Sequence, residues 1–182
     1  MSDDALIGGI EKRKIVLVDY DPRWPEKFQK HAQLIERILG KNARAIEHVG
    51  STSVPGLAAK PIIDILVVVE DASDEPAYLP AFLGAGYVLR VREPDWHQHR
   101  MFKSPELDVN IHIFSAGCVE ITRQIVFRDR LRTSVVDRRL YESVKRRLAK
   151  QDWPDTNAYA CAKTEVVEQI TARALQEAVN VA

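Results

Sequence analysis

Cysteine is scarce in this chain, with only Cys118 and Cys161 among 182 residues. Two isolated thiols are too few for a disulfide framework or a structural zinc site. The N-terminus lacks the apolar run of a signal peptide, and no stretch approaches the roughly 20 apolar residues of a membrane span. We therefore expect a cytoplasmic protein that does not enter the membrane.

Net charge is also absent, because 26 basic residues balance 26 acidic ones. Such a balance gives the whole molecule no general attraction to nucleic acid or anionic membranes. Basic residues are nevertheless concentrated between positions 120 and 150, where ten stand against four acidic ones. The segment lacks the interleaved aromatic residues of a stacking platform, which argues against nucleic acid. The surplus indicates either a phosphate-bearing ligand or ordinary solvated helix faces.

The size and the 46% hydrophobic content fit one compact domain. Residues 1–13 are predicted to be a flexible N-terminus and residues 14–182 a single domain, with a helical C-terminal part at about 118–180. Pro25 stands where a helix can begin, and Gly40 where it can end. Other predicted elements are an extended segment at 14–18, strands at 44–49, 61–69, 87–91, 100–103 and 107–114, and helices at 25–39, 78–83, 118–132, 134–151 and 155–179. Strands first and helices last predict an α+β fold, a mixed sheet backed by helices.

A Gly-Ser turn follows the first of the central strands. Gly50 allows a phosphate group to approach the backbone, and the amides and hydroxyls of Ser51, Thr52 and Ser53 can donate to it. A turn of this kind is also common for structural reasons alone. The turn therefore supports a phosphate site only in combination with other residues.

Asp64 is the one carboxylate within an otherwise apolar strand, a costly position unless it is paired, hydrogen-bonded or bound to a cation. If strand 107–114 is its neighbour, then Asp108, Asn110 and His112 reach the same face. Carboxylate, amide and imidazole groups can together hold a divalent cation that bridges phosphate oxygens. The structural alternative is that Asp64 pairs with an Arg or Lys and that His112 is a core histidine.

Several longer motifs resemble one known family. YDPRWPEKF, IEHVGSTSVPGLAAKPIIDILVVV, NIHIF, FRDRLR and YACAK, spread from about Val16 to Ala174, are similar to the GrpB family, a branch of the nucleotidyltransferase superfamily. The resemblance implies a nucleotidyltransferase-like mixed sheet flanked by helices. It also implies that Gly50 and Ser51 bind a nucleotide triphosphate and that Asp64 is the first metal-binding acid. The second acid is missing, because Leu66 stands in its place.

Two functions follow, and the sequence leaves both open. The first is a metal-dependent nucleotidyl or phosphoryl transferase acting on a nucleotide or a phosphorylated small molecule, with Mg²⁺ or Mn²⁺. Its catalytic residues are Asp64 and His112, its metal ligands Asp64, Asp108 and His112, and its phosphate-binding residues Gly50, Ser51, Thr52, Ser53, Lys60, Arg100, Arg128, Arg132 and Lys163. The alternative, favoured by Leu66, is a non-catalytic module of the same fold that binds a nucleotide, coenzyme A or a phosphometabolite. The sequence indicates no oligomeric state.

Overall fold

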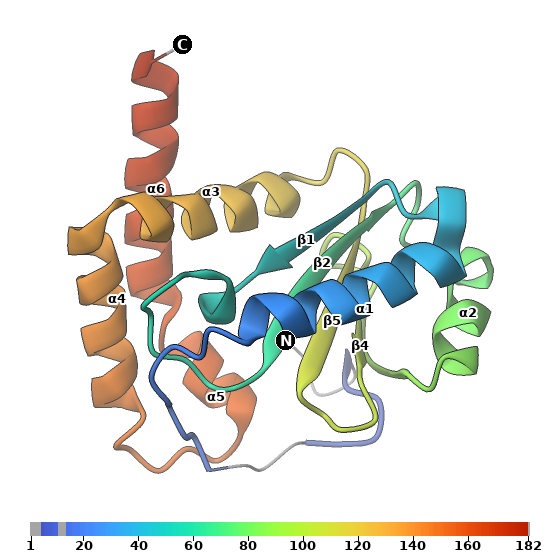
Figure 1. The fold of residues 1–182 in the computed structure, drawn as a ribbon, viewed down its shortest axis with the longest axis horizontal. Coiled ribbons are helices and arrows are strands. Elements are labelled where there is room, and N and C mark those ends of the chain that lie inside the picture. Colours follow the sequence, from blue (N-terminus) through green and yellow to red (C-terminus); the bar gives the residue numbers. More distant parts are fainter. Residues whose placement is uncertain (1–4, 11–13, 182) are drawn as a thin grey trace.

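A five-stranded mixed sheet forms the centre of the molecule in the computed structural model, which describes residues 5–10 and 14–181. The strand order is β1-β2-β5-β4-β3, and the one parallel pair in this sheet is β2 with β5 (Figure 1). In this pairing Asp64 lies beside Asn110 and Leu66 beside His112. The strands are β1 (Ala45–Val49), β2 (Ile63–Val69), β3 (Val88–Glu93), β4 (His99–Lys103) and β5 (Val109–Ser115).

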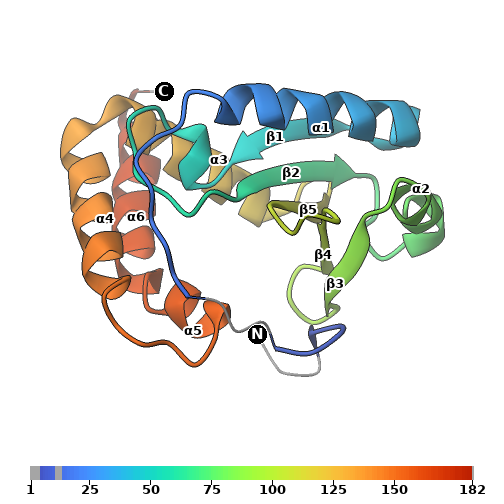
Figure 2. The ribbon, with the colours of Figure 1, turned by 60° about the horizontal axis from the view of Figure 1, so that its bottom comes forward.

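Two helices cover one face of the sheet. Helix α1 (Trp24–Leu39) and the short α2 (Leu79–Gly84) pack on the odd-numbered residues of β2 and β5, which are apolar except for Ser115 at the end of β5 (Figure 2). This core includes Ile63, Ile65 and Ile111, which are fully buried. Pro25 lies in the first turn of α1, where a missing amide hydrogen has no cost.

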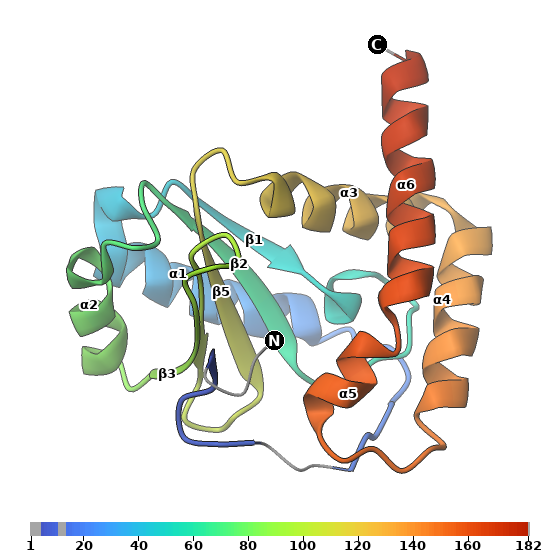
Figure 3. The same ribbon diagram turned by 180° about the vertical axis from the view of Figure 1, so that it is seen from behind.

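The even-numbered residues of the central strands face the other side, which is only partly covered. Helix α3 (Val119–Thr133) packs there on an apolar cluster that contains Leu66 and Phe114. Helices α4 (Val135–Leu148), α5 (Thr156–Cys161) and α6 (Thr164–Val181) follow on the side of the sheet where β1 ends and β2 begins (Figure 3). A second apolar cluster joins α3, α4 and α6 to the linker between β1 and β2, with residues Val54, Leu57, Leu131, Tyr141, Val166 and Ile170. Beyond α3, Asn110 and His112 of β5 border hollows on this face.

The mixed sheet, its flanking helices and the helical C-terminal part confirm the predicted fold class. The extended segment predicted at 14–18 forms no strand of the sheet, and Val18 makes an isolated bridge to Ala59 in the linker before β2. One local prediction is wrong, because the predicted helix 155–179 is two helices, separated at Ala162 and Lys163. The break contains no proline or glycine, so tertiary packing, with Tyr159 of α5 buried against Leu148, imposes it.

The predicted flexible segment 1–13 falls largely on residues 1–4 and 11–13, which lie outside the described part. Between them, Leu6 forms a bridge with Val91 of β3, and the amide of Ile7 donates to the carbonyl of Arg90 at 2.9 Å. Among the described residues, no helix has both the length and the apolar character needed to span a bilayer.

Candidate functional site: a glycine turn, one carboxylate and buried lysines

The turn after β1 brings the backbone against Asp64. Val49 pairs with Asp64 across the antiparallel β1–β2 ladder, so Gly50 begins its turn directly above this carboxylate. Gly50 has φ +70° and ψ −174°, a region that essentially only glycine adopts. A Cβ at position 50 would lie 3.0 Å from Cβ and 3.1 Å from Cγ of Asp64. Glycine is therefore required here by both conformation and space.

Asp64 shares the open face of the sheet with Asn110 and His112, as predicted. The Asn110 side-chain amide donates to Oδ1 of Asp64 at 2.9 Å, and Nε2 of His112 lies 3.7 Å from the same oxygen. Burial opposes ionisation of Asp64, but its interactions with His112, Asn110 and Lys60 outweigh burial, so that the pKa of Asp64 is lowered. The carboxylate is therefore ionised at neutral pH.

A buried lysine on α4 reaches the same turn. The Lys145 side chain is 2% exposed, and its Nζ donates to Oγ of Ser51 at 3.0 Å and to the Ala58 carbonyl. Its Nζ also lies 4.7 Å from the centre of the Tyr141 ring. Burial, with the charge of Lys163 as a second cause, lowers the pKa of Lys145 to about 7.

Two more lysines meet over one aromatic ring on α5. Lys60 and Lys163 place their Nζ atoms 5.4 and 4.8 Å from the centre of the Tyr159 ring. Burial lowers the pKa of Lys163, while the charge of Asp64 acts in the opposite direction. The sequence pattern points to Lys60 and Lys163 but not to Lys145 or Tyr159. One signal was available for Lys145, because it shares a helical stripe with Tyr141 and Leu148, where an exposed lysine is not expected.

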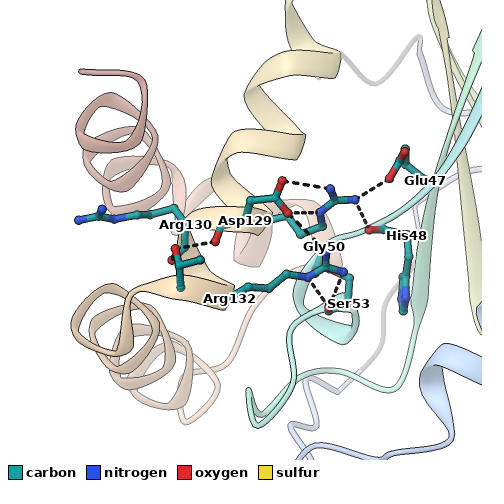
Figure 4. Close-up of polar contacts among 9 residues, drawn as sticks. Glu47, His48, Gly50, Ser53, Asp129, Arg130 and Arg132 are labelled. Atoms are coloured by element: carbon teal, nitrogen blue, oxygen red, sulfur yellow. Dashed lines mark hydrogen bonds and ion pairs between the residues drawn. The ribbon is translucent and has the colours of Figure 1, made fainter. Parts of the chain in front are cut away.

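The two arginines predicted on α3 hold the turn from the helix side (Figure 4). Arg132 donates twice to the carbonyl of Ser53, at 2.9 and 3.1 Å. Arg128 donates to the carbonyl of His48 at 3.1 Å and forms an ion pair with Glu47 at 2.7 Å. Their donors are thus engaged with the backbone and carboxylates around the turn.

Four further residues of the predicted phosphate and metal site have side chains that contact other groups instead. Arg100 lies on the opposite face of the sheet, where it pairs with Glu75 at 2.6 Å. Asp108 pairs with Lys27 of α1 and accepts from Ser104 at 3.1 Å, so its carboxylate is not gathered with that of Asp64. The side chains of Thr52 and Ser53 are turned into the protein, where they donate to backbone carbonyls of Ile62 at 3.3 Å and Gly50 at 2.6 Å, respectively.

The donor set fits one divalent cation, not two. Across residues 5–10 and 14–181, no group of three or more His, Cys, Asp or Glu side chains is placed to hold a metal ion. Leu66, which replaces the expected second acid, is fully buried in the apolar cluster under α3. Asp64 remains as a partly exposed carboxylate, and Oδ1 of Asn110 is a buried acceptor without a hydrogen-bond partner. A single hard cation at Asp64 would therefore take most of its ligands from phosphate and water.

Two hollows meet at His112. One, of about 450 Å³, is bordered by Lys60 and Asn110, and the other, of about 710 Å³, by Trp96 and Phe114. His112 and Ala160 border both. The open face of the sheet thus has room for two groups, one on each side of the imidazole.

Comparisons with known proteins agree on one family. The family described as "GrpB protein" matches residues 14–173. A Halalkalibacterium halodurans protein, UPF0157 protein BH1888, is 53% identical over 88% of this chain and 82% of its own length. A Streptomyces coelicolor protein, UPF0157 protein SCO7215, is 48% identical over 93% of this chain and 89% of its own. The crystal structure of conserved protein GrpB from Enterococcus faecalis covers 89% of this chain and 98% of its own, with a TM-score of 0.79 and 33% identity.

Proposed function

Since this chain belongs to the GrpB family, we propose that it binds the phosphate groups of a nucleotide or another phosphorylated small molecule at the Gly50–Ser51 turn. Lys60, Lys145 and Lys163 neutralise the phosphate charge. Asp64 holds one divalent cation, Mg²⁺ or Mn²⁺, against the phosphate oxygens, as a nucleotidyl or phosphoryl transfer requires.

The observation that carries the proposal is the proximity of two ammonium groups, of the buried Lys145 and the half-buried Lys163, to a glycine turn and a single carboxylate. Lys145 and Lys163 each have a pKa lowered by burial, which measures the cost of keeping them charged without enough anionic partners. A bound phosphate supplies the missing negative charge. Asn110 Oδ1 and the Tyr159 hydroxyl, two buried polar atoms without partners in the described chain, both belong to side chains next to this site.

A cation at Asp64 would polarise a phosphorus–oxygen bond and offset the charge that develops on the leaving oxygen. The chain itself contributes the carboxylate of Asp64 and the acceptor oxygen of Asn110. Its lysines provide most of the positive charge that a second cation provides in a two-metal centre. This division of charge supports a transferase with one cation, in which Lys145 and Lys163 are required for binding.

A second candidate is a non-catalytic module that binds a nucleotide, coenzyme A or a phosphometabolite. The burial of Leu66 favours it, because the position of the second acid is filled by a side chain that cannot bind a cation. The module would bind phosphate through its lysines alone. Its affinity would then be the same with and without divalent cations.

A thermal-shift panel separates the two candidates. ATP, GTP, CTP, UTP, dephospho-CoA and CoA are each tested with Mg²⁺, Mn²⁺ or EDTA on the wild type, Asp64→Asn and Lys145→Met. A ligand at about 100 times its Kd adds about 2.7 kcal/mol to the free energy of unfolding, a clear rise in Tm. Arg147→Met, which removes an exposed cation of α4, is the matched control.

The transferase predicts a stabilisation that needs the metal, is lost in Asp64→Asn and Lys145→Met, and persists in Arg147→Met. The binding module predicts a stabilisation that is lost only in Lys145→Met. If no phosphorylated ligand raises the Tm of the wild type, or if Lys145→Met responds like the wild type, the proposed phosphate site is wrong.

A further inference from the structure

Trp96 lies half-exposed beside the larger of the two hollows that meet at His112. This hollow of about 710 Å³, called the Trp96 hollow below, is bordered by the loop between β3 and β4, which carries Trp96, and by α3 and the junction of α5 with α6. Trp96 is 43% exposed, an unusual fraction for an aromatic side chain of this size. Hollows of roughly 300–1,000 Å³ with aromatic walls are typical of small-molecule sites. The position of Trp96 therefore indicates a small-molecule ligand.

The turn that carries Trp96 is strained and held in place. His97 and Gln98 have φ of +55° and +54°, in the left-handed region that favours glycine. The amide of His99 donates to the carbonyl of Trp96 at 3.1 Å and closes the turn. The buried Arg100 donates to the carbonyl of Gln98 at 2.8 Å, so the surrounding structure maintains the strain, as is common at ligand-binding sites. The turn thus holds the indole ring in a half-exposed position before any ligand binds.

Four aromatic rings border the Trp96 hollow in two orientations. The ring of His99 is stacked with those of His112 and Phe114, at centroid distances of 5.2 and 4.8 Å and with planes 16° and 23° apart. The ring of Trp96 is nearly perpendicular to those of His99 and Phe114, with 87° and 71° between the planes. A planar ring that is parallel to one set is therefore perpendicular to the other, so it can make stacked and edge-to-face contacts at the same time. An aliphatic ligand gains neither contact.

The helical side of the hollow is polar. Gln124 of α3 and Thr164 of α6 contribute an amide and a hydroxyl, which can both donate and accept hydrogen bonds. Heteroaromatic rings carry ring nitrogens, amino groups and carbonyl oxygens at their edges, and these are suitable partners for such side chains. The combination of aromatic rings and polar groups thus fits a heteroaromatic ring better than a purely apolar one.

The Trp96 hollow adjoins the proposed phosphate site. His112 and Ala160 border both this hollow and the one that Lys60 borders. Ala160 also directly follows Tyr159, whose ring lies against the ammonium group of Lys60. A ring in the Trp96 hollow and phosphates at the lysines are therefore neighbours, either within one molecule or in two molecules bound side by side.

We propose that the Trp96 hollow binds a planar heteroaromatic ring, with Trp96 as the residue that determines this specificity. The ring belongs either to the phosphorylated ligand itself, as the base of a nucleotide does, or to a second molecule bound beside it. The first source rests on the proposed function. The second does not, because a ring in a separate molecule can bind without phosphate.

Calorimetric titrations of ATP, UTP and inorganic tripolyphosphate, each with Mg²⁺, and of the phosphate-free adenosine and uridine test the ring site. The proteins are the wild type, Trp96→Leu, which removes the aromatic ring, and Trp96→Phe, which retains one. Leu83→Ala is the matched control, since Leu83 is an exposed apolar residue of α2, the helix on the other face of the sheet.

The two sources of the ring give different results. If the ring belongs to the phosphorylated ligand, the wild type is expected to bind ATP or UTP at least about tenfold more tightly than tripolyphosphate, because stacking of a base on an aromatic side chain is worth this much. If it belongs to a second molecule, the three phosphates bind alike, and adenosine or uridine binds protein that is already saturated with ATP. In either case Trp96→Leu removes the effect, Trp96→Phe keeps most of it, and Leu83→Ala leaves it unchanged.

The ring site and the phosphate site fail separately. Equal affinities for the three phosphates, together with no binding of either nucleoside, overturn the ring site alone, and so does a Trp96→Leu protein that keeps the wild-type preference. Binding of a nucleoside without any binding of tripolyphosphate contradicts the phosphate site and leaves the ring site in place.

A spectroscopic readout on the wild type does not depend on the folding of Trp96→Leu. The indole N–H signal of Trp96 in ¹H–¹⁵N spectra, assigned with Trp96→Phe, is expected to shift when ATP, UTP or a nucleoside is added and to stay in place with tripolyphosphate. A signal that none of the ring-bearing ligands moves overturns the proposal.

Discussion

The Asp64 carboxylate lies where the Cβ of any other residue at position 50 would have to be. Gly50 and Asp64 are brought together by the β1–β2 ladder, in which Val49 is the partner of Asp64. The Gly50 turn and the acid that would hold a cation are therefore packed directly against each other.

Gly50→Ala should be much more destabilising than the same change at Gly56. Both glycines have positive φ, +70° and +77°, but only a Cβ at position 50 meets another group, which is Asp64. Backbone strain of about 1–2 kcal/mol is expected for Gly56→Ala, and more than about 3 kcal/mol in total for Gly50→Ala. Urea unfolding of both variants measures the difference. Equal losses would mean that the contact with Asp64 has no cost.

The stability of the ligand-free protein should rise with pH above neutrality because of Lys145. Its pKa is about 7 when folded and 10.5 in its ordinary state, so between these values the unfolded chain binds more protons than the folded one. The free energy of unfolding then increases by up to about 1.4 kcal/mol per pH unit in this window. Urea unfolding at pH 7, 8, 9 and 10 should show this rise in the wild type and in Arg147→Met. The same rise in Lys145→Met would assign it to another group.

Installing the missing acid at position 66 should not create a second metal site. Leu66 is fully buried beneath α3, and Leu66→Ala should cost about 2–5 kcal/mol through the cavity alone. Leu66→Asp should cost several kcal/mol more, because it leaves a charge in an apolar cluster. Unfolding of both variants with Mn²⁺ and with EDTA provides the measurement. A Leu66→Asp protein that Mn²⁺ restores to wild-type stability would show that the strand can accommodate the two-acid arrangement.

Arg128→Met should loosen the turn itself. The change leaves the His48 carbonyl and Glu47 without their donor, at a cost of about 1–3 kcal/mol. Hydrogen exchange at Ser53 and Val54, whose amides donate within the turn, should be faster than in the wild type. Arg44→Met removes an exposed ion pair with Glu70 and should cost less than about 1 kcal/mol without affecting the turn. Unchanged exchange in Arg128→Met would mean that Arg132 alone holds the turn.

The fold could be predicted from the sequence wherever local periodicity and packing agree. The alternation of Leu107, Val109, Ile111 and Ile113 predicts a strand with one buried face. The structure places the last three in the core, whereas Leu107 precedes β5. Asp64, Asn110 and His112 could be brought together because the side-chain period of two in each strand leaves only one common face. The same alternation does not predict the partner of Asp108, whose carboxylate forms an ion pair with Lys27 of α1.

The structural features that the sequence does not predict depend on contacts between segments that are far apart in the chain. Lys145 is 94 positions from Ser51, and nothing in the sequence of α4 shows which segment its ammonium group meets. The break between α5 and α6 contains no helix-breaking residue, so the local sequence does not predict it. We attribute the break to the packing of Tyr159. The pairing of Arg100 with Glu75 likewise required knowing which face of β4 is turned toward α2.

The parallel pairing of β2 with β5 also has a consequence for folding. Asp64 and Asn110 are 46 positions apart, whereas the antiparallel pairs β1 with β2, β3 with β4, and β4 with β5 are joined by shorter connections. Because long loops are entropically costly to close, we expect the two antiparallel units to form first and to join last along β2 and β5. Pulsed hydrogen exchange would contradict this order if β2 and β5 were protected first. A ligand bound between the Gly50 turn and His112 contacts both of these units, which join late in folding. It should therefore slow unfolding and leave the folding rate nearly unchanged.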